Sequence, residues 1–269
     1  SLNKIVAAVK AKTRINKNAA LLLKARVALF EGSWEKYHAG TALVPKGPGW
    51  PGDEGYQLPG GSLEGEIEFF LTQAMDAADQ IASSISLVDN NKVIRESAAE
   101  AVNPYYDMFA SANPKNYDEV LMFRSYTDGL GTHYYNHYIY HGAQKGYTHQ
   151  MEQSMLMDNG LPVYATGSGY AGDDFIEDTK ISRDWRWQLF VKAPNEVKAF
   201  INTTVPETFP NAPVVYSTDG KTSTSTGYML GKGFSHDYNN QVLGKDRTAA
   251  VIFRAAEAYL IYLEASYLK

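Results

Sequence analysis

The chain has 269 residues, of which 44% are hydrophobic, so it can bury a substantial core as one large domain or two smaller ones. Its net charge of −5, with no local cluster of Lys and Arg, gives no electrostatic footprint for nucleic acid. The sequence contains no cysteine, which excludes disulfides, cysteine-ligated zinc, iron–sulfur clusters and thiol catalysis. No apolar run reaches the roughly 18 residues that would predict a membrane span.

Helical patterns dominate the beginning of the chain. We expect a short amphipathic helix over 2–12 and a long helix, rich in Ala and Leu, over 15–38. A loop dense in Gly and Pro follows over 45–61. Ser62 then precedes acidic residues, as a helix N-cap does, and apolar residues at helical spacing predict a helix over 62–84. These two long helices would form a hairpin with a long connection.

The last stretch, 249–265, predicts a central helix that is covered on most sides. It contains no Gly or Pro, and its only charges, Arg254, Glu257 and Glu264, fall within one narrow sector of a helical wheel. The stretch also aligns with 19–29, with alanines and large apolar residues at matching places. Helices rich in Ala and Leu can resemble one another by chance, but two such copies favour an interrupted helical repeat.

The middle of the chain, 101–245, lacks this periodicity. We expect a short helical turn over 103–109, a strand over 119–126, and helices over 148–158 and 195–202. The remainder predicts turns, short strands and loops, which is typical of a binding region laid over a scaffold.

These patterns together predict a mainly α fold, in which a tetratricopeptide-like helical-repeat scaffold bears a large, irregular, loop-rich insertion with short strands. We expect 1–269 to form one core. Its helical repeat would comprise 1–100 and 246–269, and its ligand-binding region 101–245. The chain contains 19 Tyr against 11 Phe. Since Tyr combines an apolar ring with a polar tip, this excess is typical of partly exposed binding surfaces, although most of these Tyr would cap the edge of the core.

A series of short segments is informative through its order and spacing rather than through any one member. These segments are 18–32, 34–38, 103–106, 118–121, 124–126, 157–164, 183–186, 225–228 and 253–265. Together they resemble the RagB/SusD family, the surface lipoproteins that capture nutrients for outer-membrane transporters. The likeness spans nearly the whole chain but only the central part of a typical member. It therefore implies a truncated central fragment that lacks the lipidated N-terminal Cys of the family.

The resemblance implies non-catalytic binding of an oligosaccharide or polysaccharide at the surface of a Gram-negative outer membrane, for delivery to a TonB-dependent transporter. Membrane attachment is implied only through the lipid anchor that this sequence lacks, and no cofactor, metal or nucleic acid is implied. A peptide-capturing member of the same family is one alternative. A metal- or carboxylate-dependent hydrolase and a purely structural lid are two others.

The segment 132–141, extended to Tyr147, is the best candidate for a ligand-binding surface. Aromatic rings stack on the apolar faces of sugars, while Tyr, His and Asn side chains hydrogen-bond to sugar hydroxyls. The resemblance implies a glycan site in the loops after the strand-like segment, where this stretch lies. Alternatively, the rings pack under the following helix. The candidate residues are Tyr134, Tyr135, Asn136, His137, Tyr138, Tyr140, His141 and Tyr147.

Trp50 and Tyr56 are a second pair of candidate ligand-binding residues. Both lie in the Gly- and Pro-rich loop over 45–61, where an aromatic ring can serve as an exposed sugar platform. Otherwise the two rings fold back onto the scaffold.

A zinc site is a weaker hypothesis. His133, His137 and His141 are spaced by four residues, so on a helix they would share one face and could hold Zn²⁺. Gly131 and Gly142 at the ends of the segment disfavour a regular helix, and no nearby acid supplies the general base of a hydrolytic zinc site.

Two further patterns favour structural roles. The acids Asp173, Asp174, Glu177 and Asp178 lie in one loop, where they are more often solvated than catalytic. Trp185 and Trp187 alternate with polar residues, so on a strand both rings would point to one face, most simply the core.

Overall fold

The computed structural model describes residues 11–128, 131–142, 144–201, 206–210, 213–216 and 223–269. The helix expected over 2–12 lies almost entirely outside these residues. The chain divides into two compact units, each built from segments that are distant in sequence. Unit 1 comprises Ser1–Val88, Lys115–Arg124 and Val251–Lys269, and unit 2 comprises Asp89–Pro114 and Ser125–Ala250.

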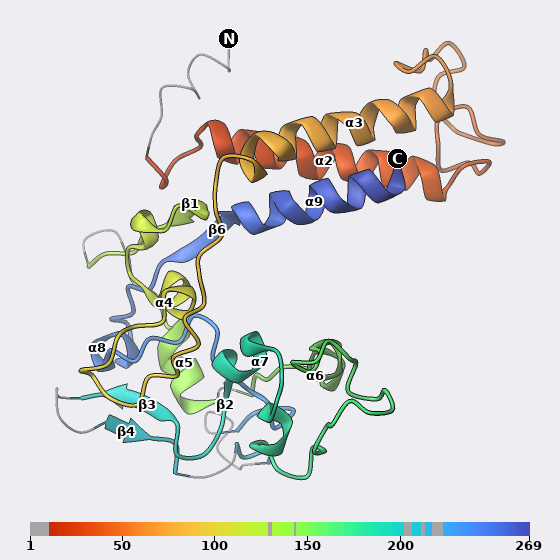
Figure 1. Cartoon of the computed structure of the whole chain (residues 1–269). Coiled ribbons are helices and arrows are strands. Elements are labelled where there is room, and N and C mark those ends of the chain that lie inside the picture. Colours follow the sequence, from red (N-terminus) through yellow and green to blue (C-terminus); the bar gives the residue numbers. More distant parts are fainter. Residues whose placement is uncertain (1–10, 129–130, 143, 202–205, 211–212, 217–222) are drawn as a thin grey trace. The chain divides into compact units, whose positions relative to one another are not determined.

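Three long helices lie alongside one another in unit 1 (Figure 1). They are α2 (Lys17–Tyr37), α3 (Leu63–Ala82) and α9 (Ala255–Leu268). The first two confirm the helices expected over 15–38 and 62–84. Ser62 caps α3 as predicted, and Asn16, which was not predicted as a cap, caps α2: their side chains accept hydrogen bonds from backbone amides that have no partner within the helix.

Small residues on the facing sides of these helices allow close packing. The core combines alanines with larger apolar residues: Leu22, Ala25 and Ala28 of α2, Leu71, Ala74, Ala77, Ala78 and Ile81 of α3, and Ala255, Ala258, Ile261, Ala265 and Leu268 of α9. Gly32 belongs to the same face, because a Cβ atom at that position would lie 3.0 Å from the side chain of Leu71. Side chains that need little space therefore define how the helices meet.

The prediction of one continuous helix over 249–265 is wrong for the first part of this stretch. Residues Ala250–Arg254 form strand β6, which pairs with β1 (Val120–Arg124), and α9 begins only at Ala255. Val251, Ile252 and Phe253 favour an extended chain when a partner strand is present, because β-branched and aromatic side chains fit a pleated surface. The strand β1 itself confirms the one expected over 119–126.

The predicted helical repeat and the predicted burial of this stretch are also wrong. Residues 19–29 are helical throughout, whereas the aligned 249–259 change from strand to helix. Outward-facing residues of α9 are exposed, with Leu260 at 65%, Leu263 at 67% and Tyr267 at 86%. The sequence similarity between the two segments therefore reflects a shared Ala- and Leu-rich composition and no structural repeat.

Unit 2 consists of short elements. Its helices are α4 (Pro104–Ala110), α5 (Tyr135–His141), α6 (His149–Ser154), α7 (Trp185–Phe190) and α8 (Tyr238–Gln241), with a 3-10 turn at Asp178–Lys180. Its strands form two antiparallel pairs, β2 (Val191–Lys192) with β5 (Met229–Leu230) and β3 (Val197–Phe200) with β4 (Pro206–Thr208). Another 3-10 turn, Pro114–Asn116, falls where the chain leaves unit 2.

Several expectations for this region need correction. The short helix at 103–109 is confirmed as α4, but the helix expected over 148–158 is only α6. The helix expected over 195–202 is strand β3. Trp185 and Trp187 lie on helix α7, where Asp184 caps the amide of Arg186, and the buried ring is that of Trp187.

The predicted mainly α, tetratricopeptide-like fold is therefore wrong. Only α2, α3 and α9 are long, with 21, 20 and 14 residues, and the other described α-helices have seven residues or fewer. A repeat of this kind needs a paired helix at each step, but the chain before α9 is a strand. Within the described residues, no helix combines the length and apolar character required to cross a membrane.

Candidate functional site

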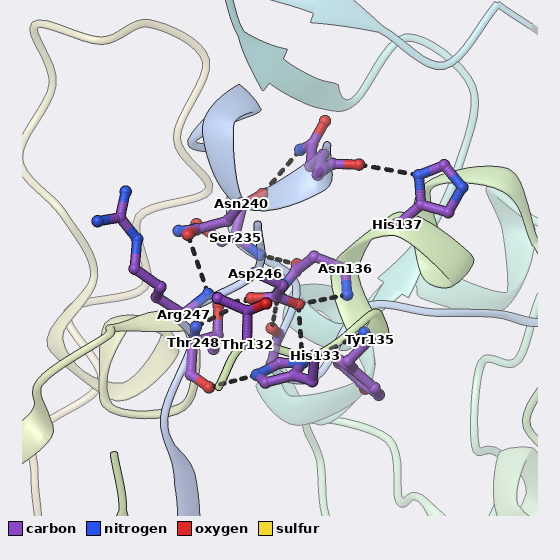
Figure 2. Close-up of polar contacts among 12 residues, drawn as sticks. Thr132, His133, Tyr135, Asn136, His137, Ser235, Asn240, Asp246, Arg247 and Thr248 are labelled. Atoms are coloured by element: carbon purple, nitrogen blue, oxygen red, sulfur yellow. Dashed lines mark hydrogen bonds and ion pairs between the residues drawn. The ribbon is translucent and has the colours of Figure 1, made fainter. Parts of the chain in front are cut away.

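A buried polar network fixes helix α5 in unit 2 (Figure 2). Its centre is the carboxylate of Asp246, which is 0% exposed. One oxygen, Oδ2, accepts hydrogen bonds from the backbone amide of Asn136 at 2.7 Å and from its side-chain Nδ2 at 2.9 Å. The other oxygen accepts from the backbone amide of Thr248 at 2.9 Å. Such a set of donors stabilises a carboxylate that has been removed from water.

His133 completes this network at the entrance to α5. Its Nδ1 lies 3.1 Å from Asp246 Oδ2, and its Nε2 lies 2.7 Å from the carbonyl oxygen of Thr248. The neighbouring Thr132 hydroxyl donates to the carbonyl of Gly244. The segment over 132–136 is thus held to the segment over 244–248 by side chains from both.

Asn136 has a structural role, which differs from the ligand-binding role predicted for it. Its side chain is 0% exposed, its Nδ2 also donates to Thr248 Oγ1 at 2.9 Å, and its Oδ1 accepts from the amide of Ser235 at 2.6 Å. Both ends of the amide are engaged by the protein, so Asn136 orients α5 and does not face a ligand.

The opposite side of α5 presents tyrosine rings to solvent. Tyr134 is 49% exposed and Tyr138 is 48% exposed. Their ring centroids lie 6.2 Å apart at an interplanar angle of 53°. The position that a Cβ atom of Gly244 would take lies 3.6 Å from the Tyr134 ring, so the ring rests on a residue without a side chain. The pair forms an aromatic surface on a helix that is fixed from behind.

Tyr135 and Tyr147 are anchored by the protein through their hydroxyl groups or rings. The hydroxyl of Tyr135 donates to the carbonyl of Lys232 at 2.5 Å, although the residue remains 40% exposed. Burial, together with the charges of Tyr147 and Asp246, raises the pKa of Tyr135 to about 12. Tyr147 is half-buried, packs on Trp187 with centroids 5.8 Å apart, and has a pKa raised chiefly by burial. Both are neutral hydrogen-bonding groups at physiological pH.

The histidines of α5 face different partners. His137 Nδ1 lies 3.1 Å from the carbonyl oxygen of Gln241, and the His137 and His141 rings lie 4.8 Å apart. A helix does form here, contrary to the expectation from the flanking glycines. Among the residues that the structure describes, no group of three or more His, Cys, Asp or Glu could hold a metal ion. Tyr140 belongs to α5, but its side chain lies outside the described residues.

The second candidate pair lies in unit 1. Trp50 and Tyr56 are half-buried, with ring centroids 5.6 Å apart. The Tyr56 hydroxyl donates to Glu66 at 3.3 Å. Glu66 and Glu35, from α3 and α2, are each 1% exposed, and burial followed by the charge of Glu66 raises the pKa of Glu35 to about 7. These two rings thus fold back over buried acids.

The acidic loop is solvated, as the pattern favours. Asp173, Asp174 and Glu177 are exposed and Asp178 is half-buried. The arginine that lies closest to this region in sequence, Arg183, is instead fully buried and binds Glu152 at 2.6 Å. The segment over 183–186 therefore contributes a structural ion pair.

A cavity of about 180 Å³ in unit 2 was not predicted from the sequence. Lys192, Arg95, Tyr106 and His236 are among its lining residues. Lys192 is only 4% exposed, and its ammonium lies 5.2 Å from the centroid of the Tyr106 ring. The signal for this site was a lysine inside the apolar run 190–193, where a charge is unexpected.

Burial shifts the pKa of three groups around this cavity, Lys192, His236 and Tyr106. It lowers the pKa of Lys192 to about 8, partly offset by the charge of Glu196. Burial, followed by the charges of Lys192 and Arg95, holds the pKa of His236 well below its usual range. Burial likewise raises the pKa of Tyr106 well above its usual range. Shifted titratable groups around a cavity are typical of functional sites.

Comparison with known proteins yields no match to a protein-family model, to a curated protein or to a solved structure. The geometry of the chain itself is therefore the basis for the functional assignment that follows.

Proposed function

We propose that this protein binds an oligosaccharide or polysaccharide without catalysing its breakdown. The observation that carries the proposal is the pair of half-exposed rings, Tyr134 and Tyr138, on a helix whose other face is fixed by the Asp246 network. Rings held in place before binding lose little conformational freedom when a sugar stacks on them.

The wider setting follows from the resemblance of the short sequence segments to the RagB/SusD family. On that basis we propose a surface-exposed location at a Gram-negative outer membrane and delivery of the ligand to a TonB-dependent transporter. A peptide is the alternative ligand, because tyrosine-rich surfaces also suit peptide backbones.

The test is calorimetric titration with plant, host and fungal oligosaccharides. We expect at least one to bind without product formation, and the Tyr134→Ala and Tyr138→Ala variants to bind it about fivefold more weakly, because an aromatic contact contributes on the order of 1 kcal/mol. Tyr164→Ala is the matched control, since Tyr164 is 80% exposed and lies elsewhere in unit 2. Equal losses in the control variant would contradict the assigned surface.

Failure of every glycan to bind would remove the oligosaccharide proposal. Titration with peptides would then decide whether the same tyrosine pair serves peptide capture, again by comparing Tyr134→Ala with Tyr164→Ala.

A further inference from the structure

Lys192 carries a buried charge that the surrounding protein balances only in part. Its ammonium has three N–H donors, yet within the described residues its one hydrogen bond is a long contact of 3.4 Å with the Tyr106 hydroxyl. The Tyr106 hydroxyl is itself committed, because it donates to the carbonyl of Phe234 at 2.6 Å. A buried ammonium in this state favours a ligand that accepts hydrogen bonds and carries negative charge.

The acid whose charge acts on Lys192, Glu196, is engaged elsewhere. Its Oε1 forms an ion pair with Lys180, and its Oε2 accepts a hydrogen bond from the amide of Ala193 at 3.2 Å. Glu196 therefore compensates Lys180 first and leaves the charge of Lys192 only partly balanced.

A second cation lies on the cavity wall. The guanidinium of Arg95 stacks 4.7 Å from the centroid of the Phe200 ring and donates to the carbonyls of Ser97 and Ala98. Its charge and that of Lys192 both lower the pKa of His236. Three acids, Asp107, Glu196 and Asp237, also line the cavity, and Asp237 accepts two hydrogen bonds from Asn239 at the start of α8.

The size of the cavity limits the ligand. Pockets for drug-sized molecules usually enclose about 300–1,000 Å³, whereas this cavity has about 180 Å³. It suits a molecule no larger than a monosaccharide. Among its lining residues, the Tyr106 ring has its centroid 5.2 Å from the Lys192 ammonium and suits an apolar or ring-shaped body.

We propose that this cavity is a binding site for a small organic acid, with the carboxylate received by Lys192 and Arg95. The site is separate from the tyrosine surface, because Tyr134, Tyr135 and Tyr138 do not line the cavity. It would give the protein a preference for acidic over neutral compounds of similar shape. A monosaccharide acid combines the required charge and size with the hydroxyl groups that Tyr106 and His236 can reach.

The test compares D-glucuronate with D-glucose, which differ by a carboxylate in place of a hydroxymethyl group. Calorimetric titration of the whole chain should show glucuronate binding at least about tenfold more tightly than glucose. Lys192→Met should abolish that difference. Lys198→Met is the control, because it removes the same charge from unit 2 but Lys198 pairs with Glu207 and does not line the cavity. Equal binding of both sugars, or unchanged binding by Lys192→Met, would overturn the proposal.

A second measurement needs no variant. Reductive methylation with formaldehyde, followed by peptide mass spectrometry, reports how accessible each lysine amine is. Glucuronate should protect Lys192 several-fold and leave Lys198 unaffected, whereas glucose should protect neither. Absence of protection at Lys192 would contradict the site. Protection of Lys192 by lactate, a smaller acid, would support carboxylate binding while excluding a requirement for a sugar.

Glucuronate binding at the cavity can be distinguished from oligosaccharide binding at the tyrosine surface. Tyr134→Ala should leave glucuronate binding at the cavity unchanged, since Tyr134 does not line it. Loss of glucuronate binding in Tyr134→Ala would assign the acid to the tyrosine surface and overturn the cavity site.

Discussion

Unit 2 and unit 1 bury carboxylates in contrasting ways. In unit 2, Asp246 accepts hydrogen bonds from the backbone and side-chain amides of Asn136 and from the backbone amide of Thr248. In unit 1, neither carboxylate oxygen of Glu35 has a hydrogen-bond partner among the described residues. Both groups are almost completely removed from water, at 0% and 1% exposure.

The contrast follows from the length of the elements. The long helices of unit 1 satisfy their own backbone groups and pack through small apolar side chains, so one poorly placed acid is tolerated. The helices of unit 2 are too short to satisfy most of their own backbone groups. Buried side chains therefore form hydrogen bonds with the backbone groups that remain. Arg183 illustrates this, because it donates to the carbonyls of Thr179, Glu152 and Met155. The buried carboxylate of Asp246 in unit 2 is therefore hydrogen-bonded at both oxygens, whereas that of Glu35 in unit 1 is not.

The largest expected effect comes from breaking the network of unit 2. Asp246→Ala leaves the buried donors of Asn136, the amide of Thr248 and the His133 ring without their acceptor, so we expect the free energy of unfolding to fall by about 3–5 kcal/mol. Urea denaturation measures this, and Asp173→Ala, at an exposed position, is the control and should change it by less than about 0.5 kcal/mol. A loss below about 1 kcal/mol for Asp246→Ala would contradict the contrast between the units.

An intermediate effect is expected at Lys192, the exception within unit 2. Its pKa is lowered from 10.5 to about 8 in the folded chain, so the unfolded chain binds more protons between these two pH values. The free energy of unfolding should therefore rise as pH increases from about 8 to about 10.5, by on the order of 2–3 kcal/mol. Lys192→Met should remove this rise and stabilise the chain at pH 7, as measured by urea denaturation across pH. The same slope in Lys192→Met and in the wild type would assign it to another group.

A smaller effect is expected at Glu35. Its pKa is raised from 4.5 to about 7 by burial and by the charges of Glu66 and Glu31. Here the folded chain binds more protons, so the free energy of unfolding should fall as pH rises from about 4.5 to about 7. We expect Glu35→Gln to reduce that slope and to stabilise the chain by on the order of 1–2 kcal/mol above pH 7. Glu64→Gln, at the exposed start of α3, is the control, and an equal gain there would contradict the assignment.

The sequence predicts well what is decided locally. The Ala- and Leu-rich run of α2 and the Ser62 cap and apolar spacing of α3 define two helices whose bounds fall within two residues of those expected. The helix predicted over 250–254 is wrong because the conformation of this stretch depends on β1, a partner strand far away in the sequence. Its Val, Ile and Phe residues are ambiguous until that partner is known.

For the candidate site too, local features could be predicted from the sequence and features that depend on distant segments could not. Its tyrosine-rich composition indicated an exposed surface, and Tyr134 and Tyr138 are half-exposed. The burial of Asn136 was not predictable, since it requires Asp246 from a segment that carries no signal for pairing with α5. The cavity at Lys192 was missed because a lysine in an apolar run is ambiguous without the residues that enclose it.

The distribution of unit 1 over three chain segments has a consequence for how it assembles. The hairpin of α2 and α3 is synthesised before unit 2, but the helix that covers it, α9, follows only after unit 2 in the sequence. The ion pair between Arg26 and Glu257 closes a loop of 231 residues. Contacts of such sequence separation form late and slowly. The apolar face of the hairpin consequently stays open to the solvent until α9 has been synthesised, and a chaperone that shields it would raise the yield of folded protein.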